Sequence, residues 1–544
     1  MSKHRRSSAF GNDQLGEENR TESTVQPAGS GARKLRRAGL SGLLAALAGL
    51  GLSELISALL PGGVSPMLAV GAFIIDIVPP FLKDLAISLF GTQDKLVLLI
   101  SIGAGIAVFA AVSGIAERFR PPLGSVFITV FGIAGVLAAI TRANASWSAA
   151  LPALAGGAFS VLVLRFLISA LQKPSTQAPA SATEGTERAG LIARRSFGQL
   201  AIGAAAIGVI GIAVGRAISQ AATTAYRFVI PQAQNPEALP EGTDLNIDGL
   251  SPFVTPNGDF YRIDTALTVP QIDPQQWSLR IFGMVDQEVT VSFEELLTMP
   301  VLERSVTLTC VSNEVGGELA GNAIWTGVPI RDLLSKAGVS DDADMVLSMS
   351  QDGYTAGTPL DALTDPNRDA ILAMAMNGEP LPPEHGYPVR MVAPGLYGYV
   401  SATKWVVSME VTRFDQKQAY WTPRGYAEKA PIKLASRIEV PKSFASLTPG
   451  PVVVAGTAWA QHTGVDAVEV RFDKGPWQRA TLGAVPSNDT WRQWRYEWDA
   501  QGAGTHYIEV RAIDASGTVQ TQESAPPLPD GSSGWHNRAV KIEG

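Results

Sequence analysis

The only cysteine of the chain, Cys310, is the residue whose chemistry constrains the function most. It ends the β-branched run Val306-Thr-Leu-Thr-Cys310 and is followed by Asn313, which gives the pattern Cys-x-x-Asn. One cysteine forms no intramolecular disulfide and cannot build a cysteine-ligated zinc or iron–sulfur site. A thiolate is a soft ligand that suits a redox-active metal. Cys310 is therefore either a small buried apolar side chain or a metal ligand.

Four stretches of sequence around and after Cys310 form a recognisable set. After the Cys310 loop comes Trp325-Thr-Gly-Val-Pro-Ile-Arg-Asp-Leu-Leu334, and the later stretches are His385-Gly-Tyr-Pro-Val-Arg390 and Gly395-Leu-Tyr-Gly-Tyr-Val-Ser401-Ala-Thr403-Lys404-Trp405. In order and spacing they resemble the molybdenum-binding core of the sulfite oxidase and assimilatory nitrate reductase family.

The resemblance implies a role for each matched position. Cys310 corresponds to the thiolate that ligates molybdenum, and it is the one metal ligand expected from the protein. A pterin that ends in a phosphate favours Arg, Lys and backbone amides as donors. The positions expected to contact the cofactor, molybdenum-molybdopterin, are Cys310, Asn313, Asp352, His385, Arg390, Ser401, Thr403 and Lys404.

Two further residues are catalytic candidates by the same resemblance. Phe260-Tyr261-Arg262 resembles the entry strand whose arginine reaches the metal, although two extra residues lie before Pro270. Asp352-Gly-Tyr354 resembles the segment that carries an active-site tyrosine. Tyr354 is thus either a proton donor or a packed aromatic side chain.

The match departs from the family directly after the Cys-x-x-Asn pattern. Sulfite-oxidising members have arginines there, whereas this chain has Glu314-Val315, and a carboxylate facing the metal would repel an anion. The cofactor is therefore better supported than sulfite as substrate. We expect oxygen-atom transfer with a small-molecule substrate. The alternatives are a sulfoxide or N-oxide reductase on the same cofactor, and a membrane receptor or transporter with an external binding module.

The N-terminal part of the chain concentrates its apolar residues. The predicted membrane spans, each near the roughly 20 residues that cross a bilayer as a helix, are 38–60, 96–116, 123–140, 149–171 and 197–215. A sixth run, 66–90, contains Asp76, Pro79-Pro80 and Lys83-Asp84, so we predict a re-entrant or interfacial segment there.

Positive charge predicts the topology of these spans. Lys and Arg collect in short cytoplasmic loops, and they cluster at 33–37, at Arg118 with Arg120, and at 188–195. Five crossings place all three clusters inside and the C-terminal half outside. Arg194-Arg195 before an apolar run also resembles a twin-arginine export signal, although the positive-inside rule alone predicts such a pair.

The remainder of the chain predicts two further domains. Period-two strands such as Val468-x-Val470-x-Phe472 between Gly and Pro turns indicate an antiparallel sandwich. The expected fold is an all-α transmembrane bundle, an α+β sulfite-oxidase-type domain and an all-β immunoglobulin-like sandwich. The predicted boundaries are a cytoplasmic tail at 1–37, the transmembrane region at 38–220, a linker at 221–249, the catalytic domain at 250–430 and the sandwich at 431–544.

Composition also bears on partners. The net charge of −7 argues against nucleic acid, which requires a basic surface. The chain has too few cysteines for an iron–sulfur cluster. It also has neither a Cys-x-x-Cys-His motif nor a histidine in a predicted span, which argues against a bound haem. We therefore expect a separate electron-carrier protein or subunit. The C-terminal domain is also a candidate for forming a homodimer.

Overall fold

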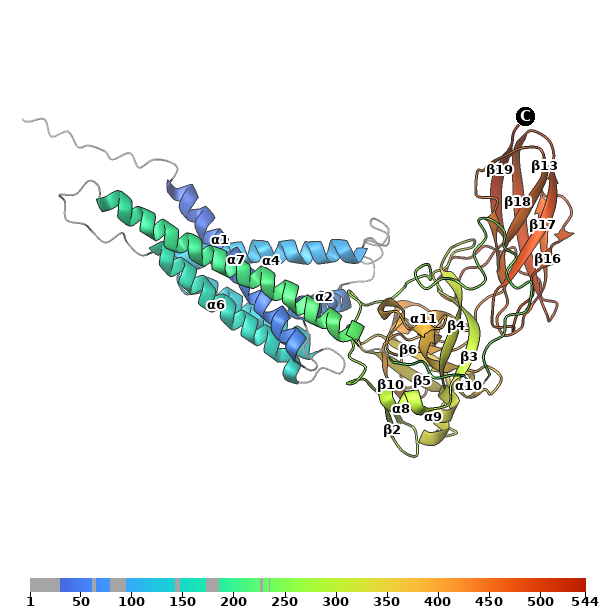
Figure 1. Cartoon of the computed structure of the whole chain (residues 1–544), viewed down its shortest axis with the longest axis horizontal. Coiled ribbons are helices and arrows are strands. Elements are labelled where there is room, and N and C mark those ends of the chain that lie inside the picture. Colours follow the sequence, from blue (N-terminus) through green and yellow to red (C-terminus); the bar gives the residue numbers. More distant parts are fainter. Residues whose placement is uncertain are drawn as a thin grey trace, which may run out of the picture.

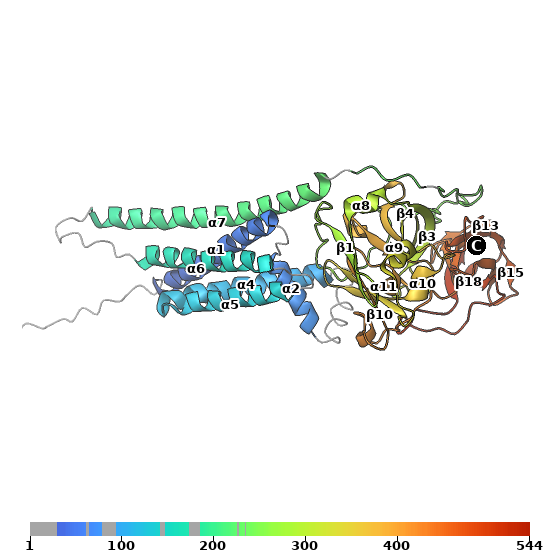
Figure 2. The same cartoon turned by 90° about the horizontal axis from the view of Figure 1, so that it is seen from below.

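The computed structural model describes residues 30–60, 65–78, 94–141, 147–172, 185–225, 228–233 and 235–544. A helical bundle, a β-rich middle domain and a β-sandwich follow one another along the molecule (Figure 1). The perpendicular view in Figure 2 shows the middle domain between the bundle and the sandwich.

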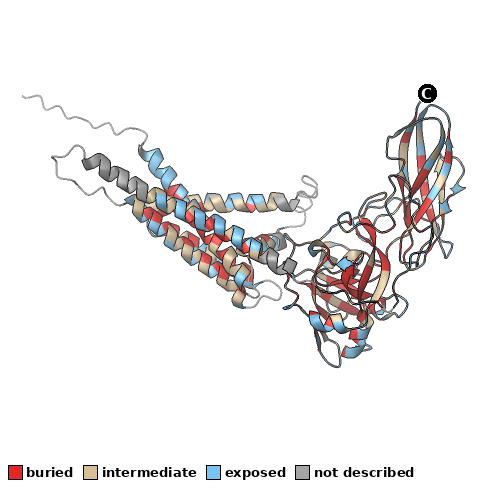
Figure 3. Cartoon of the chain, viewed as in Figure 1, coloured by how far each residue is buried: buried red, intermediate tan, exposed pale blue. Residues whose placement is uncertain are grey.

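Five helices of the bundle are long and apolar enough to cross a membrane, as predicted. Their outer faces carry exposed apolar side chains such as Leu162 and Ile202, which is the pattern expected for contact with lipid (Figure 3). Glycines let the helices approach closely, since a Cβ at Gly42 would overlap the backbone of Ala110. These helices are α1 (Ser30–Leu59), α4 (Asp94–Phe119), α5 (Leu123–Ile140), α6 (Ala150–Gln172) and α7 (Gly185–Ala225).

The predicted interfacial run begins with helix α2 (Pro66–Ile77), whose 12 residues rise about 18 Å. That length is short of the roughly 30 Å hydrocarbon core of a bilayer. Residues 79–90 of this run lie outside the described residues. The pair Arg194-Arg195 falls within α7, but its side chains are also outside them.

Two sheets form the middle domain, joined by the short helices α8 (Phe293–Thr298), α9 (Ile330–Ala337), α10 (Leu360–Thr364) and α11 (Gly398–Ser401). Ser292 and Glu295 form a capping box at the start of α8. The first sheet has the order β2-β1-β10-β5-β6, with β1 and β10 parallel. Its strands are β1 (Ser278–Gly283), β2 (Val289–Ser292), β5 (Met345–Ser350), β6 (Thr355–Pro359) and β10 (Val406–Thr412).

The second sheet of the middle domain delivers Cys310. Its order is β3-β4-β7-β8, and the short strand β9 also pairs with β7. The pairing of β3 with β4 is antiparallel and runs to Thr309 opposite Ala320, so Cys310 begins the connection between them. The strands are β3 (Leu302–Thr309), β4 (Ala320–Pro329), β7 (Ile371–Met376), β8 (Glu379–Pro380) and β9 (Arg390–Val392).

The C-terminal part is a sandwich of two sheets with the orders β11-β13-β17-β16 and β12-β19-β18-β14-β15. Val468, Val470 and Trp494 are fully buried between the sheets, in agreement with the predicted alternation. The strands are β11 (Ala435–Val440), β12 (Ser446–Leu447), β13 (Gly450–Trp459), β14 (Val465–Phe472), β15 (Gln478–Arg479), β16 (Thr481–Leu482), β17 (Arg492–Ala500), β18 (Gly504–Asp514) and β19 (His536–Ile542).

Candidate active site

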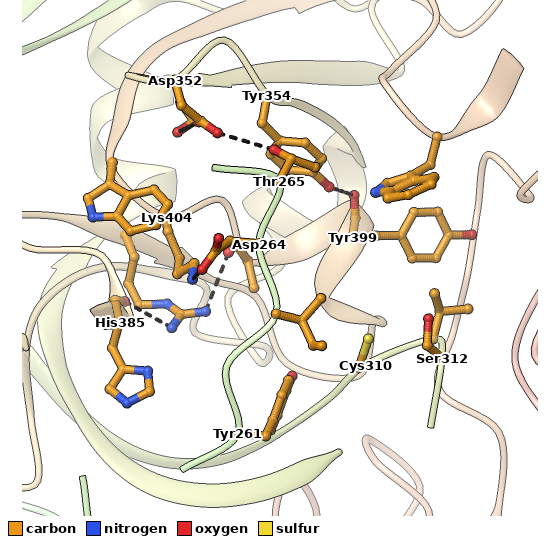
Figure 4. A pocket seen from close by; sticks show the side chains of 18 of the residues that line it. Tyr261, Asp264, Thr265, Cys310, Ser312, Asp352, Tyr354, His385, Tyr399 and Lys404 are labelled. Atoms are coloured by element: carbon orange, nitrogen blue, oxygen red, sulfur yellow. Dashed lines mark hydrogen bonds and ion pairs between the residues drawn. The ribbon is translucent and has the colours of Figure 1, made fainter. Parts of the chain in front are cut away.

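The Cys310 thiol lines a cavity of the middle domain that is drawn in Figure 4. The cavity holds about 920 Å³ of empty space when the open solvent at its mouth is counted. Six of the residues predicted from the sequence line it together, although they come from five separate segments: Cys310, Asp352, Tyr354, His385, Arg390 and Lys404.

Basic residues gather on one side of Cys310. Figure 4 shows His385 and Lys404 on the side of the cavity opposite Ser312 and Tyr399. Lys404 Nζ pairs with an Asp264 carboxylate oxygen at 2.7 Å, and both side chains are at most one-tenth exposed. Burial lowers the pKa of Lys404 to about 8, and the Asp264 carboxylate opposes that effect.

Arg390 is the buried cation whose charge lacks a carboxylate partner among the described residues. Its guanidinium donates to the carbonyls of His385 at 3.0 Å, Ala402 at 3.3 Å and Met391 at 3.4 Å, and it lies over the Trp325 ring. Burial lowers the pKa of Arg390 to about 10. A buried charge held only by carbonyls favours binding of an anion.

His385 is held as a neutral imidazole. Burial, and next the charge of Arg390, lower its pKa to about 4. Its Nε2 lies 2.9 Å from the Asn257 carbonyl. In the neutral ring Nε2 therefore carries the proton and donates it, which leaves Nδ1 as an acceptor.

Cys310 is a buried thiol that meets donors from its own loop. Burial raises its pKa, while hydrogen bonds from the backbone N–H and the hydroxyl of Ser312 oppose that rise. Those two donors would stabilise an anionic sulfur. A coordinated metal deprotonates such a thiol outright, so the site is suited to a thiolate ligand rather than to a free thiol.

Aromatic residues form the other side of the cavity. Tyr354 O–H donates to the Tyr399 carbonyl at 2.8 Å, and burial raises the pKa values of both tyrosines. Trp421 and Tyr426 pack edge to face with ring centroids 5.2 Å apart and also line the cavity. No lysine or arginine among the described residues lines this half, because the two basic residues in the lining are Arg390 and Lys404.

Four predicted residues are not in the cavity lining. Arg262 has a 43% exposed side chain and pairs with Asp264 at 3.0 Å, whereas its neighbour Tyr261 faces the cavity. Asn313 closes the Cys310 loop by accepting a hydrogen bond from the Leu319 N–H at 2.8 Å.

Ser401 and Thr403 are buried beneath the wall of the cavity. Ser401 Oγ donates to the Leu396 and Tyr397 carbonyls, and Thr403 Oγ1 lies 2.8 Å from Ser348 Oγ. Both side chains thus hold the segment that presents Lys404. Ser401 and Thr403 therefore support the wall of the cavity and do not line it.

Several residues that line the cavity were not predicted from the sequence as site residues. Asp264 is one, and its only signal was its position two residues after Arg262. Ser312, inside the Cys-x-x-Asn pattern, is another. Tyr261, Tyr399, Trp421 and Tyr426 carried no charge or spacing signal of their own.

The donor set fits a molybdenum-pterin cofactor. Within the part of the chain that the structure describes, no group of three or more His, Cys, Asp or Glu side chains could hold a metal by itself. A metal at Cys310 therefore needs most of its ligands from a cofactor. The buried guanidinium of Arg390 in the same cavity provides a place for the anionic end of such a cofactor.

Comparisons with known proteins agree with this geometry. Residues 266–421 match the family described as "Oxidoreductase molybdopterin binding domain". Mouse mitochondrial sulfite oxidase is 30% identical over 56% of this chain and 63% of that protein. The chain thus spans somewhat less than two thirds of the sulfite oxidase that it matches.

A bacterial relative is covered more completely. The uncharacterized oxidoreductase YuiH from Bacillus subtilis is 36% identical over 28% of this chain and 74% of that protein. Among solved structures, the sulfane dehydrogenase SoxCD from Paracoccus pantotrophus aligns with a TM-score of 0.47 at 23% identity, over 58% of this chain and 94% of that chain. With its matched domain and these relatives, the chain belongs to the sulfite oxidase family of molybdopterin-binding oxidoreductases.

Proposed function

We propose that the protein is a membrane-bound oxidoreductase that transfers an oxygen atom at a mononuclear molybdenum-molybdopterin centre. The observation that carries this proposal is one cavity that contains both the Cys310 thiol and the buried guanidinium of Arg390, which pairs with no carboxylate among the described residues. When bound, the cofactor supplies two-electron redox chemistry and the acceptor or donor of the oxygen atom.

The residues of this chain hold and orient that group. Cys310 supplies the thiolate, with the Ser312 donors directed at its sulfur. Arg390 and Lys404 bind the anionic end of the pterin, and the neutral His385 offers it an acceptor. Arg262 acts indirectly, because it pairs with the same Asp264 carboxylate that neutralises Lys404.

Tyr354 is the proposed proton donor to the reacting oxygen. Burial raises its pKa, so its hydroxyl keeps the proton at neutral pH and remains a donor. In the free site that proton is directed at the Tyr399 carbonyl. A developing negative charge on a substrate oxygen would compete for it.

The aromatic half of the cavity favours a neutral substrate over a small oxyanion. Its walls are Tyr399, Trp421 and Tyr426, and it lacks a basic residue among the described lining. Glu314 is exposed and does not line this cavity. A neutral sulfoxide or N-oxide, or its reduced form, is therefore favoured over sulfite as the substrate class.

The five apolar helices anchor the enzyme in the cell membrane, with residues after α7 on the extracytoplasmic side. The three clusters of Lys and Arg predicted to lie inside support this orientation. In this orientation a domain that receives its cofactor in the cytoplasm must cross the membrane already folded. Arg194-Arg195 is the proposed signal for that export. A separate carrier protein exchanges electrons with the metal. The C-terminal sandwich has an immunoglobulin-like fold, and the protein forms a homodimer through it.

The proposal is tested by analysis of the purified full-length protein. Molybdenum and released pterin are quantified first. Oxidation of sulfite is then measured with an artificial electron acceptor, and reduction of neutral sulfoxides with an artificial electron donor. Near-stoichiometric molybdenum and faster turnover of the neutral substrate are expected. Protein purified from molybdenum-replete cells without molybdenum or pterin would contradict the assignment.

A further inference from the structure

The connection from β3 to β4 is a short closed loop with the thiol at its base. The Cys310 N–H donates to the Leu319 carbonyl at 2.9 Å, and the Asn313 N–H donates to the Cys310 carbonyl at 3.0 Å. The Asn313 side chain accepts from the Leu319 N–H at 2.8 Å. The position of the sulfur therefore depends on the conformation of residues 313–319.

The C-terminal sandwich contacts the tip of this loop at three successive points. Ser532 Oγ donates to the Asn313 carbonyl at 2.6 Å, and Arg437 Nη1 donates to the Gly317 carbonyl at 2.9 Å. Between them, the His536 ring lies against Gly316, where an added Cβ would overlap the ring. All three contacts come from sequence more than 100 residues away.

These partners are themselves held in place. Arg437 Nε pairs with Glu439 at 2.8 Å, both side chains are nearly buried, and Glu439 also accepts from Thr457 Oγ1 at 2.9 Å. The His536 Nδ1 accepts from the Ile438 N–H at 2.9 Å. Arg437 and His536 are therefore held in place by hydrogen bonds within their own part of the chain.

One of these contacts requires a glycine at position 316. Gly316 has φ +79°, a conformation that favours glycine, and a side chain there would displace His536. Glu314 is exposed beside this interface. The conformation and small size of Gly316 thus fit its contact with the sandwich.

We propose that Ser532, Arg437 and His536 are positioning residues for the Cys310 thiolate, so that the C-terminal sandwich is a working part of the cofactor site. This inference rests on the proposed molybdenum ligation by Cys310. It assigns the sandwich a role that acts through backbone contacts to residues 313–317, whether or not the sandwich also forms a dimer.

The test compares two neighbouring serines in the full-length protein. Ser532→Ala removes the contact to Asn313, whereas Ser533→Ala removes a hydrogen bond to the Glu523 carbonyl within the C-terminal part of the chain. Loss of one hydrogen bond changes an opening equilibrium about fivefold. In cofactor-free protein, Ser532→Ala should speed hydrogen exchange at the Leu319 amide about fivefold, and Ser533→Ala should leave it unchanged.

A spectroscopic readout on loaded protein completes the test. The electron paramagnetic resonance signal of the half-reduced molybdenum should shift in Ser532→Ala and match the parent in Ser533→Ala. Equal exchange and equal spectra in both variants would overturn the positioning role. A parent that binds no molybdenum would instead refute the proposed function, while the exchange measurement would still report on the loop.

Discussion

Arg390→Gln is the substitution that separates cofactor binding from folding. The guanidinium is fully buried and its pKa is lowered to about 10 from 12.5, so burial disfavours its charge by about 3 kcal/mol. Its hydrogen-bond partners in the described structure are backbone carbonyls. Removing the charge should therefore leave the cofactor-free protein as stable as the parent or slightly more stable.

Cofactor binding should respond in the opposite sense. A charge-assisted hydrogen bond contributes about 1.5–3 kcal/mol, so losing it weakens binding of the pterin roughly 10- to 150-fold. The assay is molybdenum per protein after purification, together with the thermal midpoint of the cofactor-free form. Arg390→Lys keeps the charge and should recover part of the occupancy.

A matched control comes from a second arginine near the site. Arg368 Nη1 also donates to a backbone carbonyl, that of Pro394 at 3.0 Å, but it is not part of the cavity lining. Arg368→Gln should keep full molybdenum occupancy. Full occupancy in Arg390→Gln, or equal losses in both variants, would refute the anion-binding role of Arg390.

Three further perturbations have expected outcomes. Asp264→Asn leaves the buried Lys404 without its counter-ion, so the pKa of Lys404 should fall below its present value of about 8. The variant should therefore release the cofactor faster at pH 8 than at pH 6. Release at a rate independent of pH would count against the pairing of Asp264 with Lys404. The pKa of His385 is about 4 in the folded protein and 6.5 in the unfolded chain. Its contribution to the free energy of unfolding, about 3 kcal/mol, is therefore complete above pH 6.5 and is lost as the pH falls towards 4. Urea midpoints over that range should decline less in His385→Asn than in the parent; parallel declines would show that other groups dominate. Changing Arg194 and Arg195 together to Lys should keep the C-terminal half in the cytoplasm, where it is protected from protease added to intact protoplasts. If the protease digests this variant as it digests the parent, the pair only obeys the positive-inside rule.

Local sequence pattern predicted the elements of this fold that depend on local chemistry. The predicted apolar runs form five long helices. The period-two strands bury Val468 and Val470 between two sheets. In each case the signal and the structure lie in the same short segment.

The site could be predicted only where a motif carried it. Cys310, His385 and Lys404 meet in one cavity, as the matched stretches implied. Arg262 does not line it, and Tyr261 does. In an extended segment neighbouring side chains point to opposite sides, so a match that is uncertain by one residue reverses which of them faces the cavity.

The remaining parts of the site depend on distant contacts. The partnership of Asp264 with Lys404 spans 140 residues, and that of Asn313 with Ser532 spans 219. No spacing rule relates such positions before the domains are packed together. The role of the C-terminal sandwich at the Cys310 loop therefore emerges only from the folded structure.

Metal ligation by Cys310 is the central claim, and X-ray absorption at the molybdenum edge tests it most directly. The parent and Cys310→Ser are purified from the same molybdenum-replete cells and compared at equal metal content. We expect Cys310→Ser to retain the fold, to lose one sulfur neighbour of the metal and to lose turnover. An unchanged sulfur shell in Cys310→Ser would contradict the account.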